Sequence, residues 1–399
     1  MRILFCNYEY PPLGGGGGVV NAALARELAR THDVTVLTSQ AFDLPRRSLE
    51  DGVRILRVPV WFRRREAAAN LPSMAAYVVN AMRLGRDLVR AERFDIVNTH
   101  FALPTGPAGQ HLARFAGLPN VLSVHGGDLY DPSKKHSPHR HAWLRACVRR
   151  LALAADAVVA QSRNTLDNLH RYYAPEVDAE IIPLGIERPP PVAPRRGDHG
   201  LDDADRVLVT VGRLVARKAV EQLIDVVAEL RDPLVRLLVI GAGPAAETLA
   251  ERARQRSVAA QVRFLGAVPE RTKHELLALA DLYVSTSQHE GFGLVFLEAM
   301  AAGLPVVCYD RGGQVDFLED GATGFLVPLN DRPAFVARCR ELLADAALRR
   351  EIAARNRARV EELFIDRCAK RYEALFAAVI EGRGAAPVAA RAARSRAAP

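Results

Sequence analysis

The sequence has few residues of the kinds that mark secreted, zinc-binding or membrane-spanning proteins. Its five cysteines are odd in number and widely spaced, with no C-x-x-C pair (Cys6, Cys147, Cys308, Cys339 and Cys368). Neither a disulfide framework nor a zinc site is indicated. No stretch approaches the roughly 20 apolar residues of a membrane span, and the N-terminal run lacks a signal peptide's long apolar region. We therefore expect a cytoplasmic protein.

Paired carboxylates that could hold a divalent metal are also scarce. The single D-x-D, Asp203-Ala204-Asp205, falls in a polar stretch ahead of an expected strand. A divalent cation takes several oxygen ligands at once, so a metal-dependent enzyme would need such carboxylates in its cleft. We expect no bound metal and no other cofactor.

The charge is positive and uneven along the chain. The net charge is +8, and residues 1–186 hold 23 Lys and Arg against 17 Asp and Glu, which leaves +6 in this part. A basic half can face an anionic membrane, nucleic acid or an anionic substrate. Nucleic acid is the weakest of these options, because no nucleic-acid motif and no alternation of aromatic and basic residues occurs.

The chain is too long for one ordinary core and suits two domains of about 180 residues. Strand-like and helix-like segments alternate, which predicts parallel sheets flanked by helices, an α/β fold of two doubly wound Rossmann-like domains across a cleft. The expected strands are 3–6, 34–38, 53–58, 96–99, 121–124, 157–160 and 180–182, then 207–211, 237–240, 262–265, 282–285 and 306–308; the expected helices of the first half are 19–30, 75–91, 106–116 and 143–154.

Composition shifts set the expected domain boundaries. The first domain covers 1–186, a Pro- and Gly-rich linker covers 187–205, and the second domain covers 206–362. The tail 382–399 is rich in Ala, Arg, Pro and Gly without periodicity, which is typical of disorder.

The most informative stretch runs from Glu290 to Val307 and places Glu298 eight residues after Glu290. It follows a buried, β-branched strand, and glycines then break that strand and let the backbone approach a ligand. A short helix with apolar residues at helical spacing follows and ends at Gly303.

The start of this helix predicts an anion site. The first amides of a helix have no intrahelical partner and favour negative charge, and here they belong to Phe292, Gly293 and Leu294. Because Cβ atoms lean toward the helix N-terminus, Glu298 reaches back toward the same place. A phosphate at the amides and hydroxyls at the carboxylates would describe a nucleotide sugar. The ordinary alternative is one capping and one solvated Glu.

This run resembles the E-x7-E signature of the family 4 retaining glycosyltransferases, which have the two-domain GT-B architecture. The likeness continues through Leu304-Pro305-Val306-Val307 and Gly312-Gly313 to the stretch 321–327, and it spans about residues 1–327. Asp316 stands where the family usually has Glu. The resemblance implies that the last helix, 363–380, returns to the first domain.

Three further motifs carry the resemblance. Gly15 and Gly16, within a run of five glycines before a helix, align with a Gly-Gly pair that contacts donor phosphate. Arg213 and Lys218 match the family's G-R-L-x-x-x-K-G, with Ala219 in place of the last Gly. Cations at this point can neutralise a departing diphosphate. His125 belongs to an H-G-x-D-like motif and is the best candidate to face the transferred sugar.

The acceptor side is less defined. His100, Asp128, Lys134 and Lys135 are candidates because they follow strands or lie in a polar, basic loop. Arg83, Arg86, Arg90 and Arg93 fall on one face of an expected helix, with Tyr77, Ala81, Leu84, Leu88 and Ala91 opposite. An ordinary surface helix explains this pattern, and contact with anionic lipid at the inner face of the membrane is compatible with it.

The resemblance implies a retaining glycosyltransferase that moves a sugar from a nucleotide-diphosphate sugar to a hydroxyl acceptor, in polysaccharide, glycolipid or cell-envelope glycan synthesis. Glu298 would hold the ribose hydroxyls and Glu290 the donor sugar. Alternatives are a nucleotide-sugar epimerase of the same fold and a non-catalytic nucleotide-sugar-binding protein. The base, sugar, acceptor and oligomeric state stay open.

Overall fold

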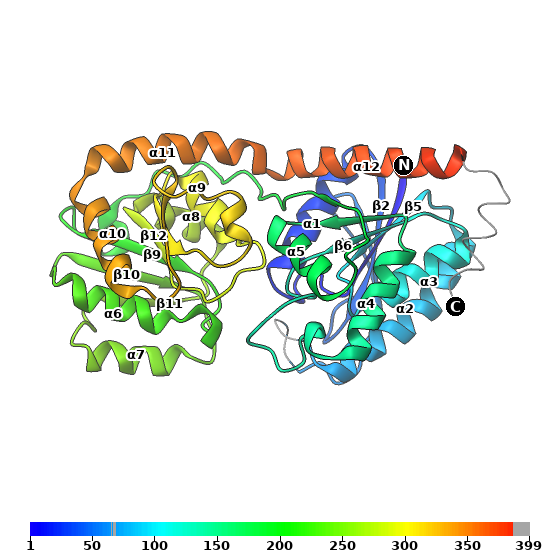
Figure 1. Ribbon diagram of the computed structural model, residues 1–399, viewed down its shortest axis with the longest axis horizontal. Helices are drawn as coiled ribbons and strands as arrows, with labels where there is room; N and C mark the ends of the chain where they lie inside the picture. Colours follow the sequence, from blue (N-terminus) through cyan, green and yellow to red (C-terminus); the bar gives the residue numbers. More distant parts are fainter. Residues whose placement is uncertain (65, 67–68, 386–399) are drawn as a thin grey trace. The chain divides into compact units, whose positions relative to one another are not determined.

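The computed structural model describes residues 1–64, 66 and 69–385 (Figure 1). The chain forms two α/β units: Met1–Glu187 together with the segment that begins at Ile365, and Arg188–Phe364. The segment expected to be a linker, 187–205, lies almost wholly in the second unit. Leu201 is buried there, and Arg196 donates hydrogen bonds to the Asp205 carbonyl and to Asp281.

The first unit is an eight-stranded sheet in the order β3-β4-β2-β1-β5-β6-β7-β8, parallel except for β3, which pairs antiparallel with β4. Its elements are β1 (Arg2–Asn7), α1 (Gly16–Ala29), β2 (Asp33–Gln40), β3 (Arg47–Glu50), β4 (Val53–Pro59), α2 (Leu71–Ala91), β5 (Ile96–His100), α3 (Gly106–Ala116), β6 (Asn120–Val124), α4 (Ala142–Ala154), β7 (Ala157–Ala160), α5 (Arg163–Tyr172), β8 (Ala179–Ile181) and α12 (Ile365–Ala385).

Strand β1 lies at the centre of this sheet and contributes side chains to the hydrophobic clusters on both faces of the sheet. Ile3 and Phe5 pack in the cluster formed with α1 and α12, whereas Leu4 and Cys6 pack in the cluster formed with α2 and α3. Successive side chains of a strand point to opposite faces, so a continuous apolar strand needs helices on both sides. This burial on both faces is the rule for parallel sheets.

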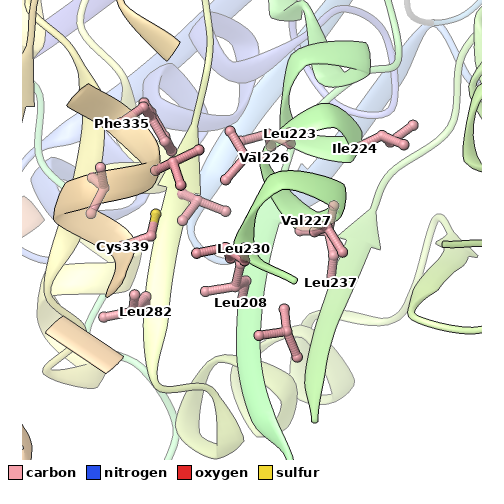
Figure 2. Close-up of a cluster of buried hydrophobic side chains, with 14 of the residues drawn as sticks. Leu208, Leu223, Ile224, Val226, Val227, Leu230, Leu237, Leu282, Phe335 and Cys339 are labelled. Atoms are coloured by element: carbon pink, nitrogen blue, oxygen red, sulfur yellow. The ribbon is translucent and has the colours of Figure 1, made fainter. Parts of the chain in front are cut away.

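The second unit is a six-stranded, all-parallel sheet in the order β11-β10-β9-β12-β13-β14. Its elements are β9 (Arg206–Val211), α6 (Val220–Leu230), β10 (Val235–Ile240), α7 (Ala246–Gln255), β11 (Val262–Gly266), α8 (Glu270–Leu279), β12 (Leu282–Ser285), α9 (Leu294–Ala302), β13 (Val306–Tyr309), β14 (Gly324–Val327), α10 (Arg332–Ala344) and α11 (Ala346–Val360). Figure 2 shows its core, where Leu223 and Val227 of α6 meet Leu208 and Leu237 of the sheet and Phe335 of α10.

Three expectations about elements need correction. Helix α1 begins at Gly16 and not at Val19, and α2 begins at Leu71 because Asn70 caps it by accepting from the Ser73 amide. Strand β3 was not expected, since three of its four residues are polar and only the pairing with β4 makes them a strand.

The C-terminal helix also runs further than expected. Residues 382–385, assigned to a disordered tail, continue α12 despite two glycines, and no proline interrupts the chain before Pro387. The remainder of that expected tail, 386–399, lies outside the described residues. Within the first unit α12 buries Cys368, Tyr372 and Phe376 on one face, and the Tyr372 hydroxyl donates to Ser123.

Among the helices that the structure describes, none combines the length and the apolar character needed to cross a bilayer.

Candidate active site

In the second unit, strand order brings the loops after β9 and β12 together. The two strands are parallel neighbours, with Leu208 opposite Leu282. The order of connection reverses at this point, since β10 and β11 lie to one side of β9 and β12 to β14 to the other. Ligands of open α/β sheets bind outside the carboxyl ends of the strands at such a switch point. The loops are joined by a hydrogen bond from the Thr286 hydroxyl to the Ala219 carbonyl, 2.8 Å long.

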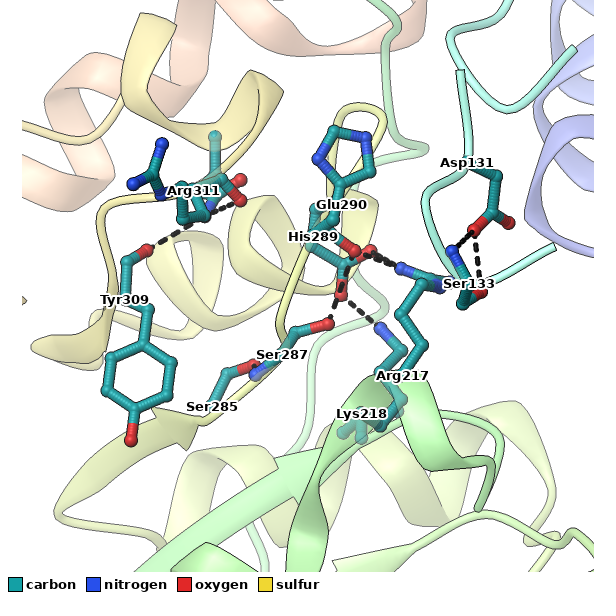
Figure 3. Close-up of polar contacts among 12 residues, drawn as sticks. Asp131, Ser133, Arg217, Lys218, Ser285, Ser287, His289, Glu290, Tyr309 and Arg311 are labelled. Carbon is teal, nitrogen blue, oxygen red and sulfur yellow. Dashed lines mark hydrogen bonds and ion pairs between the residues drawn. The ribbon is translucent and has the colours of Figure 1, made fainter. Parts of the chain in front are cut away.

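Glu290 lies in this place and pairs with two cations (Figure 3). Its side chain is buried, with 6% of the residue exposed. Lys218 donates to Oε1, and Arg217 donates to Oε2 at 3.1 Å and also to the His289 carbonyl. Burial disfavours the charged form, but the charges of Lys218 and Arg217 outweigh it and lower the pKa of Glu290 to about 2. The carboxylate is therefore ionised throughout the physiological range.

The sequence pointed to Lys218 but not to Arg217. Both belong to the loop that follows β9, and the Gln288 amide donates to the Arg217 carbonyl, which fixes that loop against the one after β12. Arg213 is exposed and, with Lys218, Gly212 and Ser285, lines one small cavity. The only sequence signal for Arg217 was its place directly before Lys218, which does not say where its side chain points.

Close backbone packing holds the cationic loop. A Cβ on Gly241 would lie 2.0 Å from the Gly212 carbonyl oxygen, and one on Gly243 would lie 2.3 Å from the Leu214 carbonyl oxygen. Only glycine fits at these two positions, so the loop after β10 can support the loop after β9. The sequence analysis did not single out either glycine.

The start of α9 has the expected geometry. Gly293 is the N-cap residue at φ 95°, and Leu294 is the first helical residue. A Cβ on Gly293 would lie 2.5 Å from the Phe296 ring. Phe292 is buried, with its ring centroid 5.1 Å from that of Phe317. The amides of Phe292, Gly293 and Leu294 belong to this helix start, and their contact with a phosphate stays a prediction.

Glu298 lies one turn further along α9, where a lysine of α8 meets it. Lys273 donates from Nζ to Oε1 of Glu298 at 3.0 Å and also pairs with the exposed Glu270 at 2.6 Å. Oε2 of Glu298 is buried and has no hydrogen-bond partner within the described part of the chain. Burial raises the pKa of Glu298, although Lys273 acts in the opposite direction. Lys273 was not recognised, since it stands in a polar run with no distinguishing pattern.

In the first unit, a second group of candidate residues gathers at the carboxyl ends of β1, β5 and β6. These strands are successive neighbours in the sheet. The glycine loop follows β1, His100 ends β5, and His125 follows β6. Gly15 is the N-cap of α1, and its amide donates to Glu9 at 3.1 Å.

Glycines 16 to 18 form the first turn of α1, where Gly17 has no room for a side chain and Gly18 has little. A Cβ on Gly17 would lie 2.7 Å from the Phe101 ring, and one on Gly18 would lie 3.2 Å from the Glu9 carbonyl oxygen. Contact of Gly15 and Gly16 with donor phosphate stays a prediction.

His100 and His125 form a buried pair. Nδ1 of His100 lies 3.0 Å from Nε2 of His125. Burial lowers the pKa of His125 to about 4 and that of His100 well below its usual range. Both rings are therefore neutral at pH 7, which favours hydrogen bonding to a sugar over proton transfer by His125. Phe101, at φ 72°, places its ring centroid 4.4 Å from that of His125.

Asp128 ties two strand ends together. Its carboxylate accepts from the Ala102 amide at 2.6 Å and from the His125 amide at 2.9 Å, and burial raises its pKa to about 6. Lys134 and Lys135 are exposed on the loop that follows, and Lys134 pairs with Asp131 at 3.1 Å. The structure thus brings His100, His125 and Asp128 together, and an acceptor-side role for these residues and the two lysines stays a prediction.

The arginine stripe of α2 is exposed at Arg83, Arg86 and Arg90, but two of the apolar residues expected opposite it are not buried. Leu84 and Ala91 are exposed, whereas Gly85 packs against Leu112 of α3. Neighbouring α3 supplies partners, because Arg86 donates to His111 and both Arg86 and Arg90 lie over the Phe115 ring.

No group of three or more His, Cys, Asp or Glu residues suited to a metal ion occurs in the described ranges. In the D-x-D segment Asp205 is buried, accepts from the Asp202 amide and pairs with Arg236 at 3.0 Å. These bonds make Asp205 part of the turn that leads into β9.

The two units match two family models. Residues 14–188 match the model described as Glycosyltransferase Family 4, and residues 193–359 match the one described as Glycosyl transferases group 1. A GDP-mannose-dependent alpha-(1-6)-phosphatidylinositol monomannoside mannosyltransferase of Mycolicibacterium smegmatis is 30% identical over 367 residues, which cover 86% of this chain and 89% of the relative. A glycogen synthase of Mycobacterium tuberculosis is 31% identical over 379 residues, which cover 90% of each.

Solved structures agree on the architecture. A sucrose-phosphate synthase from Thermosynechococcus elongatus superposes with a TM-score of 0.81 at 23% identity, covering 95% of this chain and 100% of the other. The Anabaena protein HepE in complex with UDP-glucose gives 0.75 at 19% identity, covering 95% and 100%. These likenesses establish the GT-B fold of two Rossmann-like domains, and the reported relatives do not favour the epimerase or the non-catalytic alternative. The chain belongs to glycosyltransferase family 4 and is a glycosyltransferase.

Proposed function

We propose that the chain is a retaining transferase that moves a sugar from a nucleotide-diphosphate sugar to a hydroxyl acceptor. The observation that carries the proposal is the buried Glu290 with Lys218 and Arg217 at the switch point of the second unit. Departure of a nucleoside diphosphate builds negative charge, and fixed cations in a partly buried site lower the barrier to it.

The proposed roles are those that the family resemblance implies. Lys218 and Arg213 stabilise the departing diphosphate together with the amides at the start of α9, and Glu290 accepts hydroxyls of the donor sugar. Glu298 accepts the ribose hydroxyls. Gly15 and Gly16 contact donor phosphate, and His125 faces the transferred sugar. The acceptor oxygen attacks the anomeric carbon on the face from which the diphosphate leaves, and the leaving phosphate takes the acceptor's proton.

The donor is the first thing to test. The relatives named above differ in theirs: one is GDP-mannose-dependent, and the HepE structure holds UDP-glucose. A panel of UDP-, GDP- and ADP-sugars should separate the bases by thermal shift, since a ligand at 100 times its Kd stabilises the folded state by about 2.7 kcal/mol. One base should raise the melting temperature. No shift with any nucleotide sugar, and no transfer, would contradict the proposal.

Transfer should not depend on a metal. Lys218 and Arg217 pair with Glu290, and we expect such cations to balance the diphosphate charge, a task that a divalent ion performs in other enzymes. With the donor found in the panel, we expect unchanged turnover in EDTA. A complete loss that added Mg²⁺ or Mn²⁺ restores would overturn this part of the proposal.

The acceptor side of the first unit fits an anionic or membrane-bound substrate. On α2 the exposed Val79 and the half-buried Met82 lie beside Arg83, Arg86 and Arg90 on one face. Leu71 and Val79 are 62% and 60% exposed. Basic residues near an anionic surface contribute about 1 kcal/mol each, so several together can recruit the enzyme reversibly. The partners on α3 weaken this argument, because Arg86 and Arg90 already stack on Phe115.

Vesicle sedimentation decides between recruitment and simple solubility. We expect binding to phosphatidylglycerol-containing vesicles but not to phosphatidylcholine vesicles, with loss in high salt and in an Arg83/Arg86/Arg90→Glu variant. An Arg350/Arg355/Arg359→Glu variant on α11 carries the same change of charge in the second unit and should still bind. Equal, negligible sedimentation with both vesicle types would leave a soluble acceptor as the better proposal.

A further inference from the structure

Helices α8 and α9 of the second unit share one buried cation. Lys273 of α8 is only 8% exposed, and its Nζ lies 3.0 Å from Oε1 of Glu298 on α9 and 2.6 Å from Oε2 of Glu270. The two carboxylates differ in environment, since the Glu270 side chain is 79% exposed and that of Glu298 is 18% exposed. Water can solvate Glu270 without the lysine, whereas Glu298 relies on it.

The second oxygen of the Glu298 carboxylate has no partner. Oε2 is buried and accepts no hydrogen bond within the described part of the chain. An unmatched carboxylate oxygen in a buried place costs free energy, so such a group is usually satisfied by protein, water or ligand. The lysine takes one side of the carboxylate and leaves the other side to an incoming donor of hydrogen bonds.

We propose that Lys273 is a positioning residue for donor binding: it orients the Glu298 carboxylate and holds it ionised, so that Oε2 accepts the hydroxyls of the donor's ribose. The inference rests on the proposed donor role of Glu298. A cation at Oε1 favours the ionised form, which can only accept hydrogen bonds, and it occupies one of the two oxygens. Both ribose hydroxyls then converge on Oε2, which has two lone pairs to offer.

A thermodynamic cycle separates this role from a merely structural one. The probes are the nucleoside diphosphate of the base selected in the thermal-shift panel and its 2′,3′-dideoxy form, and Kd is measured by calorimetry. Lys273→Met should raise the Kd of the ribonucleotide by about tenfold, since a hydrogen bond to a charged group contributes a binding free energy of about that size. The same substitution should change the Kd of the dideoxy compound by no more than about twofold, because that compound has no ribose hydroxyl to bind Glu298. Equal weakening of both would overturn the proposal.

Three variants complete the test. Lys273→Arg should keep most of the affinity for the ribonucleotide. It also allows the position to be tested if Lys273→Met does not fold. Glu270→Gln removes only the exposed partner and should change neither Kd, so a loss equal to that of Lys273→Met would overturn the proposal. Glu298→Gln distinguishes the two levels of the argument. If it weakens the ribonucleotide and Lys273→Met does not, the inference fails and the donor role of Glu298 stands. If Glu298→Gln has no effect, the donor role itself fails.

Discussion

The two groups of candidate residues occupy the same kind of position in their sheets but differ in how many charged side chains they contain. Each gathers at the carboxyl ends of central parallel strands, β9 and β12 in the second unit and β1, β5 and β6 in the first. Around Glu290 the groups are charged, and two cations hold its pKa at about 2. Around His125 the groups are buried with few charges, and burial alone sets the direction, lowering the pKa of His125 to about 4 and raising that of Asp128 to about 6.

The difference shows that the sheet topology determines where a site lies, whereas the side chains determine its charge and its chemistry. A cationic site suits a diphosphate whose charge increases as it leaves. A buried site with few charges suits hydroxyl groups, because further unpaired charges there would be costly. The comparison yields three predictions, in order of decreasing effect.

Removing the cations should harm turnover more than folding. With a saturating sugar donor, Arg213→Ala and Lys218→Ala should each lower kcat by roughly 100-fold or more, because both groups act where charge develops. Arg338, which pairs with Glu341 on the exposed face of α10, provides a matched control, and its Ala variant should keep normal turnover. Steady-state kinetics give the answer, and full activity of Arg213→Ala would end its assignment to catalysis.

Acid should weaken the His125 region before the Glu290 region. The folded pKa of His125, about 4, is below its ordinary 6.5, so the stability that depends on a neutral ring is complete above pH 6.5 and declines between pH 6.5 and 4. The contribution of Glu290 is complete above its ordinary pKa of 4.5 and is lost only as the pH falls toward 2. Asp128 opposes the histidine, since its raised pKa adds stability as the pH falls from 6 to 3.8.

Hydrogen exchange measures the pH dependence that His125 contributes to local stability. We expect amide exchange in β6 to accelerate between pH 6.5 and 5, after correction for the intrinsic rate, while exchange in β12 keeps its protection. In His125→Asn this pH dependence should become shallower, and His100, whose pKa burial also lowers, should account for the part that remains. A slope unaffected by the substitution would show that another group is responsible.

A smaller effect concerns the backbone of each region. Ala219 at φ 46° and Phe101 at φ 72° are both non-glycine residues in the left-handed region. Ala219→Gly should raise the free energy of unfolding by up to about 1 kcal/mol, because glycine adopts this conformation without strain. Phe101→Gly should lower it, since the ring that packs beside His125 and Gly17 is lost. Thermal melting measures both, and a lower melting temperature for Ala219→Gly would contradict the strain argument.

The candidate residues could be named from the sequence for two reasons. Glu290, Lys218 and His125 each follow an apolar, β-branched run, and a strand's end is visible in sequence. Position alone did not select Lys218 and His125, and their match to the family's motifs did. Arg217 and Lys273 could not be found in this way. Both are cations, and the ordinary expectation for a cation is exposure to solvent. Only the folded chain shows them paired with Glu290 and Glu298.

The sequence by itself determined the alternation of strands and helices, the two-domain division and the spacing of the two glutamates, because these depend on local periodicity and on glycine and proline. It also carried the family resemblance. The tertiary structure decided which loops meet, since strand order is set by long-range pairing that no local pattern encodes. It also decided the charge state of each group, because a pKa depends on burial and on neighbours that come from distant parts of the chain.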